Sequence, residues 1–538
     1  MKNEFLNAVN NFGMTTTENG ALTNKSTGSA IADQFGKVGC YRGRDIEEVF
    51  FDQQQLWNEN PSYALRFPFY LRLITRKVKI SDVAVSDKVQ RGQGQRDEAF
   101  KRLLWIASEH PDSFYKNLWV LPLIGSWKDL WVLLYYDRKY NLNVLQETKV
   151  FDLLKAGFSS NINRDLIKKF MPRIKSSSKC HTDWTKTTNR LAKDFANYLH
   201  LCYVQYNHLK TSGTAHDFQK LICTGKYSDI NWNLIPGRAL SNLANGNFLS
   251  NHNLEKLFTD WIINSPSAKF TGYVYELGNK YINMYGTKQL YKKALINKQF
   301  SELIDKAKAD GKITSNVWCA LDTSGSMSAC VPNLNGNISA IDICVSLGLF
   351  FSELNKGAFH NNVIMFDNKS HVKELKGNTF TDKIDEIYND ATAWGSTNFQ
   401  SVVDEIVRIR RTHPNIPLED YPTTLLVISD MQFNPVNGYG MSEQTNYEAM
   451  KSKMYEVFPK DWVDSFKFIW WDCIGRKKED FPAKMDDGGC YFFSGFDGSI
   501  VSLLLNDDVH GKSDKKPISM EEMIKTALTQ EVLEFIKL

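Results

Sequence analysis

The pattern of hydrophobic and polar positions changes near residue 311. From about residue 45 to 310, apolar residues recur at spacings of three and four, which is typical of amphipathic helices. Short polar or Pro/Gly breaks separate these stretches, so we expect an all-helical array of HEAT-like paired-helix repeats. The predicted helices cover residues 46–57, 63–76, 95–109, 127–136, 184–207 and 253–264.

After residue 311, short apolar runs alternate with helical stretches. The runs predict buried strands, and they read VWCAL, NVIMF, TLLVIS, FKFIWW and YFFS. The intervening helices are expected at 338–355, 398–411, 443–457 and 497–505. This alternation predicts a doubly wound sheet with helices on both faces. The expected fold class is therefore an all-helical array followed by an α/β domain, and ligands of such sheets bind at the carboxyl ends of the strands.

These patterns divide the chain into three expected segments. Residues 1–310 form the helical module, 311–506 the α/β domain, and 507–538 a linker with a C-terminal helix. The stretch 506–517, NDDVHGKSDKKP, is polar enough for a linker. Ser519 and Glu522 form a capping box, which predicts a final helix running to about Lys537.

The composition is that of an ordinary globular protein, with 42% hydrophobic and 23% charged residues. There is no basic and then apolar leader, and no run approaches about eighteen apolar residues. We therefore expect a cytoplasmic protein with no membrane partner. The nine cysteines form no CxxC pair, which favours reduced thiols and argues against a zinc site.

The charge is distributed unequally along the chain. Residues 1–310 hold 43 Lys and Arg against 29 Asp and Glu, whereas residues 311–538 hold 22 against 32. The basic half could therefore hold a polyanion. Within it, 164–193 carries nine Lys and Arg against two Asp, interleaved with Phe170, His181 and Trp184. Such a segment can contact phosphates and stack unpaired bases, although a solvated charged face is the alternative interpretation.

Candidate metal ligands gather at the ends of three predicted strands. Asp322, Ser324 and Ser326 follow the first strand, Thr397 precedes a helix in a Gly/Ser loop, and Asp430 ends the run TTLLVISD. Two carboxylates and three hydroxyls suit Mg²⁺ or Mn²⁺ and exclude soft metals. The alternative is that these side chains only cap the helices that follow. No histidine or cysteine nucleophile accompanies them, so we expect no enzymatic activity.

The motifs DTSGSM, GSTN and VISD, in this order, resemble the metal-ion-dependent adhesion site of von Willebrand factor A domains. The basic half resembles the TROVE module of the Ro autoantigen family, in a divergent branch found in bacteria, viruses and plants. The matching strings include ALRFPFYLRLITRKV, RGQGQRDEAFKRLLWI, KKFMPR and WNLIPGRAL. The match is loose over residues 194–260.

The resemblance implies a ring of helical repeats closed by the A domain. Such a ring would hold the single-stranded ends of small noncoding or misfolded RNA in a ribonucleoprotein. The metal centre would keep one coordination position open for the carboxylate of a protein partner. The positions carried over as phosphate contacts are Arg91, Arg96, Arg102, Lys168, Lys169, Arg173 and Lys175.

Three alternatives stay open at this point. The protein could be a metal-dependent protein–protein interaction scaffold without RNA. It could be a metal-dependent phosphoesterase, because Mg²⁺ between carboxylates is also a feature of phosphatases. Finally, the metal loops could only brace the sheet, which is compatible with RNA binding elsewhere.

Overall fold

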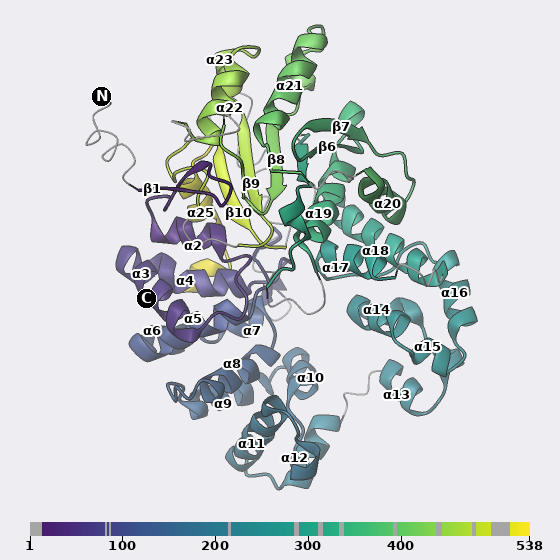
Figure 1. Cartoon of the computed structure of the whole chain (residues 1–538). Coiled ribbons are helices and arrows are strands. Elements are labelled where there is room, and N and C mark those ends of the chain that lie inside the picture. The colour runs from purple at the N-terminus through teal and green to yellow at the C-terminus, as the bar shows by residue number, and fades with distance from the viewer. Residues whose placement is uncertain are drawn as a thin grey trace. The chain divides into compact units, whose positions relative to one another are not determined.

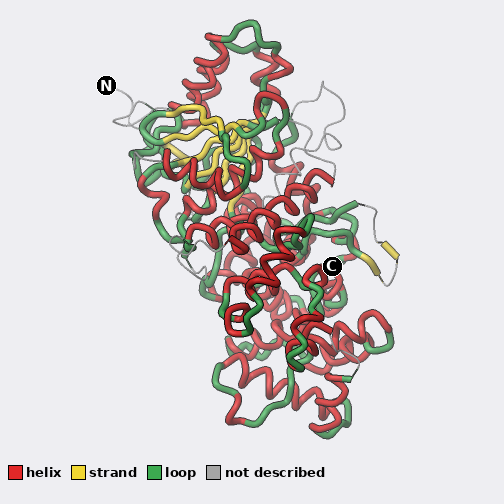
Figure 2. The backbone as a smooth tube through the Cα atoms, turned by 90° about the vertical axis from the view of Figure 1, so that its right-hand side faces the viewer, coloured by secondary structure: helices red, strands yellow, loops and turns green. Residues whose placement is uncertain are grey.

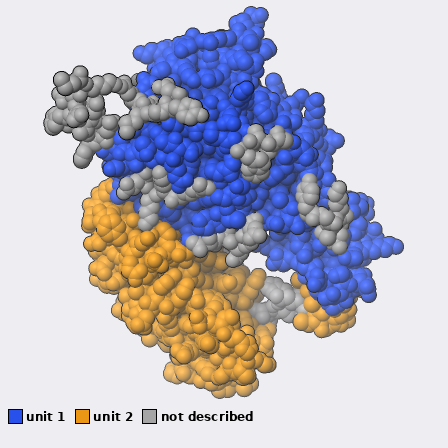
Figure 3. Space-filling view, viewed as in Figure 1, with its two compact units in different colours: residues 1–42, 231–524 blue, residues 43–230, 525–538 orange. Residues whose placement is uncertain are grey.

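The structure is a computed structural model that describes residues 13–538 except 81–82, 85–87, 213–216, 285–289, 310–315, 333–337, 391–394, 437–443, 476–479 and 497–516. The predicted helix over 497–505 and nearly all of the predicted linker lie outside the described residues. The chain forms two compact units, coloured separately in Figure 3. The helical unit contains residues 43–230 and 525–538, and the α/β unit contains residues 1–42 and 231–524.

Helices dominate the helical unit, as the pattern predicts (Figure 2). Consecutive helices pack on one another, for example α3 on α4 and α4 on α5, and α8 packs on α11. The helices are α3 Ile46–Glu59, α4 Pro61–Arg72, α5 Asp97–Glu109, α6 Pro111–Asn117, α7 Val120–Ile124, α8 Lys128–Lys139, α9 Glu147–Gly157, α10 Asn161–Phe170, α11 Asp183–Tyr198, α12 Tyr203–Thr211 and α13 Asp217–Cys223. A short hairpin, β3 Lys79–Ile80 and β4 Val83–Ala84, lies between α4 and α5.

The single helix predicted over 184–207 is wrong, because α11 and α12 are separate helices. α11 ends in a backbone motif in which His200 adopts a φ of 56°. The Leu201 amide donates to the Ala196 carbonyl and the His200 amide to that of Asn197. These bonds terminate the helix in the way that usually uses glycine. The helical spacing of apolar residues continues across this break, and for that reason the sequence pattern predicted one helix instead of two.

The α/β unit contains a six-stranded sheet in the order β10-β9-β8-β5-β6-β7 (Figure 1). All neighbouring strands run parallel except β6 and β7. The doubly wound prediction is therefore confirmed in its coarse form, with an antiparallel edge strand that it missed. The strands are β5 Trp318–Asp322, β6 Asn362–Phe366, β7 Ser370–Glu374, β8 Thr424–Ser429, β9 Lys467–Asp472 and β10 Cys490–Ser494.

Helices cover both faces of this sheet (Figure 1). On one face, Ala320 and Trp470 join a core with residues of α21 Gln400–Thr412 and α22 Asn446–Tyr455. On the other face, α19 Ala340–Leu354 packs on β5, β6 and β8. Successive side chains of a strand point to opposite faces of the sheet. Because both faces are covered here, every position is buried, and the strands are continuous apolar runs in the sequence. Further helices of the unit are α20 Phe380–Asp390 and α23 Lys460–Ser465.

The helices between residues 231 and 309 belong to the same compact unit as the sheet. The rings of Phe300 and Phe380 stack with centroids 4.0 Å apart, and the Tyr281 hydroxyl donates to Asp385 at 2.6 Å. These contacts join α17 and α18 to α20, so the compact units do not divide at the predicted segment boundary of 310. The helices are α14 Gly237–Asn245, α15 Phe248–Asn251, α16 Glu255–Asn264, α17 Val274–Ile282 and α18 Leu290–Ala309.

The N-terminal residues also pack on the sheet. They form a hairpin, β1 Met14–Thr16 and β2 Leu22–Asn24, and the helix α2 Ala30–Lys37. α2 packs on β10, and a Cβ atom at Gly39 would lie 1.9 Å from the Ser494 carbonyl oxygen. The chain can approach the edge strand this closely only because residue 39 has no side chain.

The last α-helix within the described residues is α25 Met520–Leu528. The predicted capping box is present, since the Ser519 amide donates to Glu522 and the Glu522 amide to the Ser519 hydroxyl. The helix is shorter than predicted, and a 3₁₀ turn over Leu533–Phe535 follows it. Within the helical unit, Gln530 holds the backbone of Arg91 through bonds of 2.6 and 2.8 Å.

Candidate metal centre and basic surface

Three loops meet at the carboxyl edge of the sheet, where the sequence predicts a metal. The strand register places Asp322 beside Phe366, and Leu321 beside Ile428, so Asp322 and Asp430 end neighbouring strands. The third loop is attached by two backbone bonds. The Gly325 amide donates to the Gly395 carbonyl at 3.1 Å, and the Asn434 amide donates to the Thr397 carbonyl at 2.9 Å.

Asp322 lies fully buried at the centre of this arrangement. One carboxylate oxygen accepts from the Ser324 amide at 2.9 Å, and the other from the Ser429 hydroxyl at 2.5 Å. These bonds fix the rotamer of the carboxylate before any cation arrives. Sequence reasoning missed Ser429, although its position directly before Asp430 at the end of a buried strand could have suggested it.

The other predicted ligands are buried or half-buried around Asp322. Thr397, Asp430 and Ser324 are each 1% exposed. The Ser324 and Ser326 hydroxyl oxygens lie 3.1 Å apart, so both can face one ion. The structure therefore brings all five predicted ligands to one edge of the sheet.

The electrostatics of the two carboxylates favour a cation. Burial and, after it, the negative charge of Asp430 together raise the pKa of Asp322 to about 7, against the opposing effect of the bonds from Ser429 and Ser324. Two neighbouring buried carboxylates repel each other when both are ionised, and a positive charge between them removes this repulsion. In the described part of the chain, no group of three or more His, Cys, Asp or Glu side chains could hold a metal. An ion held here would need the hydroxyls as well, and such an all-oxygen donor set fits Mg²⁺ or Mn²⁺.

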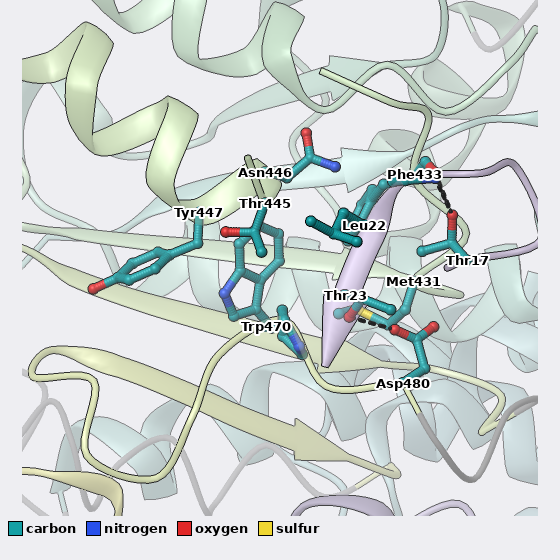
Figure 4. Close-up of a pocket in the computed structure, with 12 residues that line it drawn as sticks. Thr17, Leu22, Thr23, Met431, Phe433, Thr445, Asn446, Tyr447, Trp470 and Asp480 are labelled. Atoms are coloured by element: carbon teal, nitrogen blue, oxygen red, sulfur yellow. Dashed lines mark hydrogen bonds between the residues drawn. The ribbon is translucent and has the colours of Figure 1, made fainter. Parts of the chain in front are cut away.

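The N-terminal hairpin supports the loop that follows Asp430. The Glu18 amide donates to the Gln432 side chain at 2.7 Å, and the Thr17 hydroxyl to the Phe433 carbonyl at 2.7 Å. A small pocket lies between the hairpin and the sheet, and Trp470 and the buried Asp480 are among the residues that line it (Figure 4). The Thr23 hydroxyl donates to Asp480 at 3.0 Å.

The structure corrects two of the predicted phosphate contacts. Arg102 is fully buried and lies between the carboxylates of Glu98 at 3.5 Å and Asp52 at 3.9 Å. Arg91 is 7% exposed. Their position in a basic string suggested the surface, but the helix turns Arg102 into the core, where it compensates acids. The Glu98 to Arg102 spacing of four residues was a signal for such a pair.

The other predicted contacts separate into two places. Lys169, Arg173 and Lys175 are exposed at and after the C-terminus of α10. Lys168 is 9% exposed and donates to the Ser212 carbonyl at 3.1 Å, so it is mainly structural. Arg96 lies elsewhere in the unit, with its side chain 49% exposed and its Nε 3.6 Å from Asp129.

Lys210 joins the cluster at α10, and sequence reasoning missed it. Its ammonium donates to the Lys168 carbonyl at 3.1 Å and to the Lys169 carbonyl at 3.3 Å. Burial lowers the pKa of Lys210, and the positive charge of Arg173 lowers it further. We call Lys169, Arg173, Lys175 and Lys210 the α10 basic surface.

Aromatic side chains lie on α11 and on α12, which packs on both α10 and α11. The Lys128 ammonium lies 5.8 Å from the ring centroid of Trp184. Tyr203 at the start of α12 is 46% exposed, with Lys193 5.8 Å from its ring centroid. An exposed ring beside cations can stack on an unpaired base.

Comparisons with known proteins give matches to two families of undetermined function. Residues 317–534 match a domain of unknown function, DUF7788, and residues 17–197 match another, DUF2828. The uncharacterized protein L728 of Acanthamoeba polyphaga mimivirus is 23% identical over 524 residues, covering 91% of this chain and 84% of that protein.

Among solved structures, the RO (RSR) protein of Deinococcus radiodurans aligns with a TM-score of 0.38 and 10% identity, covering 82% of this chain and 88% of that one. None of the helices within the described residues has the length and apolar character needed to cross a membrane.

Proposed function

We propose that this protein is an RNA-binding scaffold of a ribonucleoprotein. Its helical unit holds single-stranded ends of small noncoding or misfolded RNA, and its α/β unit carries a Mg²⁺ or Mn²⁺ centre that stabilises the sheet or captures a partner. The proposal includes the ring of helical repeats and the von Willebrand-type metal site that the sequence motifs suggest, and it contains no catalytic step.

The observation that carries RNA binding is the α10 basic surface. Three exposed cations stand beside Lys210, whose lowered pKa reflects burial and the neighbouring charge of Arg173. Positive charges that repel one another gain stability when a phosphate neutralises them. The exposed ring of Tyr203 on α12, which packs on α10, provides a surface for a base.

The test is equilibrium binding of the full chain to a labelled single-stranded RNA across a salt series. The variant Lys169→Gln/Arg173→Gln/Lys175→Gln should bind more weakly. Its plot of log affinity against log salt should also be shallower by about 2, because each phosphate contact on a single strand contributes about 0.7 to the slope. A matched control changes three exposed lysines of the α/β unit, Lys356, Lys376 and Lys460, to Gln.

Equal affinity and equal slope for the parent and the triple variant would contradict the proposal. In that case the α10 basic surface is only a solvated charged face. If the control variant weakens binding as much as the triple variant does, the effect is one of net charge rather than of this surface.

A second candidate function, metal-dependent capture of a protein, is favoured by the convergence of Asp322, Thr397 and Asp430 at one sheet edge. Asp322, Ser324, Ser326, Thr397 and Asp430 would hold the ion. The ion would act as a hard Lewis acid that accepts a further oxygen ligand. A partner carboxylate is the expected ligand, so Asp322→Ala and chelation should both abolish capture of the partner. Capture that persists with chelator would exclude this function.

A further inference from the structure

Three arginines of the helical unit lie around one carboxylate, and none of them belongs to the α10 basic surface. Asp129, at the start of α8, is fully buried. Arg72, at the end of α4, is 1% exposed and binds one Asp129 oxygen through Nε at 2.8 Å and Nη2 at 2.7 Å. This pair alone would be neutral.

Two more guanidinium groups join the pair. Arg96 approaches the other Asp129 oxygen with its Nε at 3.6 Å. The Arg76 Nη2 donates to the Leu123 carbonyl in α7 at 2.8 Å and to the Gly125 carbonyl at 3.0 Å, on the loop between α7 and α8. We call Arg72, Arg76 and Arg96 the arginine cluster.

The backbone holds the arginine cluster in place. The Ile74 amide donates to the Ile124 carbonyl at 2.9 Å, and the Gly94 amide to the Leu73 carbonyl at 2.9 Å. Arg76 and Gln90 exchange two backbone bonds. These bonds connect the three segments that carry the arginines and Asp129, so the side chains start from a fixed frame.

Gly125 shows how tightly the frame closes on the ion pair. A Cβ atom there would lie 2.1 Å from an Asp129 oxygen and 2.9 Å from the Arg72 guanidinium carbon. The loop can therefore pass over the pair only because residue 125 is glycine. The Gly125 carbonyl also accepts from Arg76, so Gly125 lies beside both Arg72 and Arg76.

Within the described residues, the arginine cluster and Asp129 together carry three positive charges and one negative charge, an excess of two. Burial lowers the pKa of Arg72, and among its neighbours Arg96 and Arg76 lower it further while Asp129 opposes them. The next acids along the chain are engaged by other bases. Asp97 binds Lys101 at 2.9 Å, and Glu98 binds Arg44 at 2.8 Å. An anion would satisfy this excess, and Arg96 is half exposed to receive it.

We propose that Arg72, Arg76 and Arg96 form a binding site for a phosphate monoester, with Arg96 as the contacting side chain and Asp129 as the group that orients Arg72. A phosphate monoester carries close to two negative charges at neutral pH, which matches the excess. Guanidinium groups bind phosphate oxygens in pairs, which favours this ligand over a monovalent anion. The inference rests on the proposed function only for the source of the phosphate monoester, which would be a terminal phosphate of an RNA. Free phosphate has the same chemistry and would bind the same groups.

The experiment compares three versions of one single-stranded RNA, with a 5′-phosphate, with a 3′-phosphate, and with hydroxyls at both ends. The full chain should bind one phosphorylated version about tenfold more tightly than the version with hydroxyl ends. Inorganic phosphate should remove this preference and raise the Tm above that in chloride of equal ionic strength. Arg96→Gln should abolish both effects. The matched control, Lys175→Gln, should weaken all three RNAs and leave their ratio unchanged.

Equal affinities for the three RNAs, with no Tm gain in phosphate, would overturn the inference. An Arg96→Gln variant that weakens all three RNAs equally would also overturn it, because Arg96 would then contact an internal phosphate. Failure of every RNA to bind would refute the proposed function instead. Even then, the Tm gain in phosphate, and its loss in Arg96→Gln, would show separately whether the arginine cluster binds phosphate.

Discussion

Among single residues, the buried carboxylate of Asp322 allows the most direct test of the metal centre. This carboxylate is fully buried and feels the negative charge of Asp430, so the metal-free protein bears the cost of two buried negative charges close together. Asp322→Asn removes one of these charges and one metal ligand at the same time. We therefore expect the metal-free variant to unfold at the same Tm as the parent or a higher one.

The same substitution should abolish stabilisation by metal. At a Mg²⁺ concentration one hundred times the Kd, the parent should gain about 2.7 kcal/mol, and Asp322→Asn should gain nothing. Thermal unfolding with and without MgCl₂ measures both values. Ser328→Ala, an exposed change in the same loop, is the control and should behave as the parent does. A variant that still gains stability from Mg²⁺ would place the metal elsewhere.

The raised pKa of Asp322 gives the metal centre a pH dependence. The folded carboxyl has a higher pKa than the unfolded one, so metal-free stability falls as the pH rises from about 4 through about 7. Mg²⁺ needs the carboxylate and competes with the proton. The apparent Mg²⁺ affinity should therefore be about tenfold weaker at pH 6 than at pH 8. Tm gains that are equal at the two pH values, at one subsaturating Mg²⁺ concentration, would contradict this.

The positions of single residues were predictable only where a strand end defined them. Asp322 and Asp430 follow buried runs, and parallel strands bring their ends to one edge, so sequence order was enough. Arg102 lies in a basic string, but a charge run does not reveal which member faces the core. Lys210 could not be found because it joins α10 through packing rather than through its place in the chain.

At the scale of elements, α2 is held on the sheet by a buried ion pair. The Lys37 ammonium lies 3.3 Å from an Asp472 oxygen, and each side chain is 2% exposed. The other Asp472 oxygen accepts from the Ile474 and Gly475 amides. The pair thus connects the N-terminal segment to the carboxyl end of β9.

Lys37→Met should destabilise the α/β unit by about 3–5 kcal/mol, because it leaves the Asp472 charge buried without its partner. Adding Asp472→Asn should recover much of this loss, since the amide keeps an acceptor for the loop. Lys25→Met, at an exposed position before α2, is the control and should stay within about 0.5 kcal/mol. Urea midpoints measure the series. A double variant that is no more stable than Lys37→Met would show that packing of the lysine stem, rather than charge, is lost.

Element prediction succeeded where burial is continuous and failed where it alternates. The runs NVIMF and TLLVIS become β6 and β8 without a shift. β7, with the sequence SHVKE, is a partly exposed edge strand and gave no apolar run. The N-terminal hairpin was also missed, because its turn is held by bonds to Gln432 and Phe433 that no local pattern encodes.

At the scale of the whole molecule, the two proposed binding surfaces belong to different compact units. The α10 basic surface lies within residues 43–230, and the metal centre lies within residues 231–524. The charge of the chain changes sign at a different place, near residue 310, but its direction agrees with the proposed roles. In that proposal the basic half would contact phosphates, and the acidic half would supply oxygen ligands for a cation.

We therefore expect the two surfaces to act independently. Asp322→Asn should leave the affinity for single-stranded RNA within about twofold of the parent, a free-energy change of about 0.4 kcal/mol, which is typical of separate sites. The triple variant of the α10 basic surface should keep the full Tm gain in Mg²⁺. RNA titrations with Mg²⁺ and with chelator at equal ionic strength complete the test. An RNA affinity that drops tenfold in Asp322→Asn would instead show a coupling free energy of about 1.4 kcal/mol between the metal centre and the RNA surface.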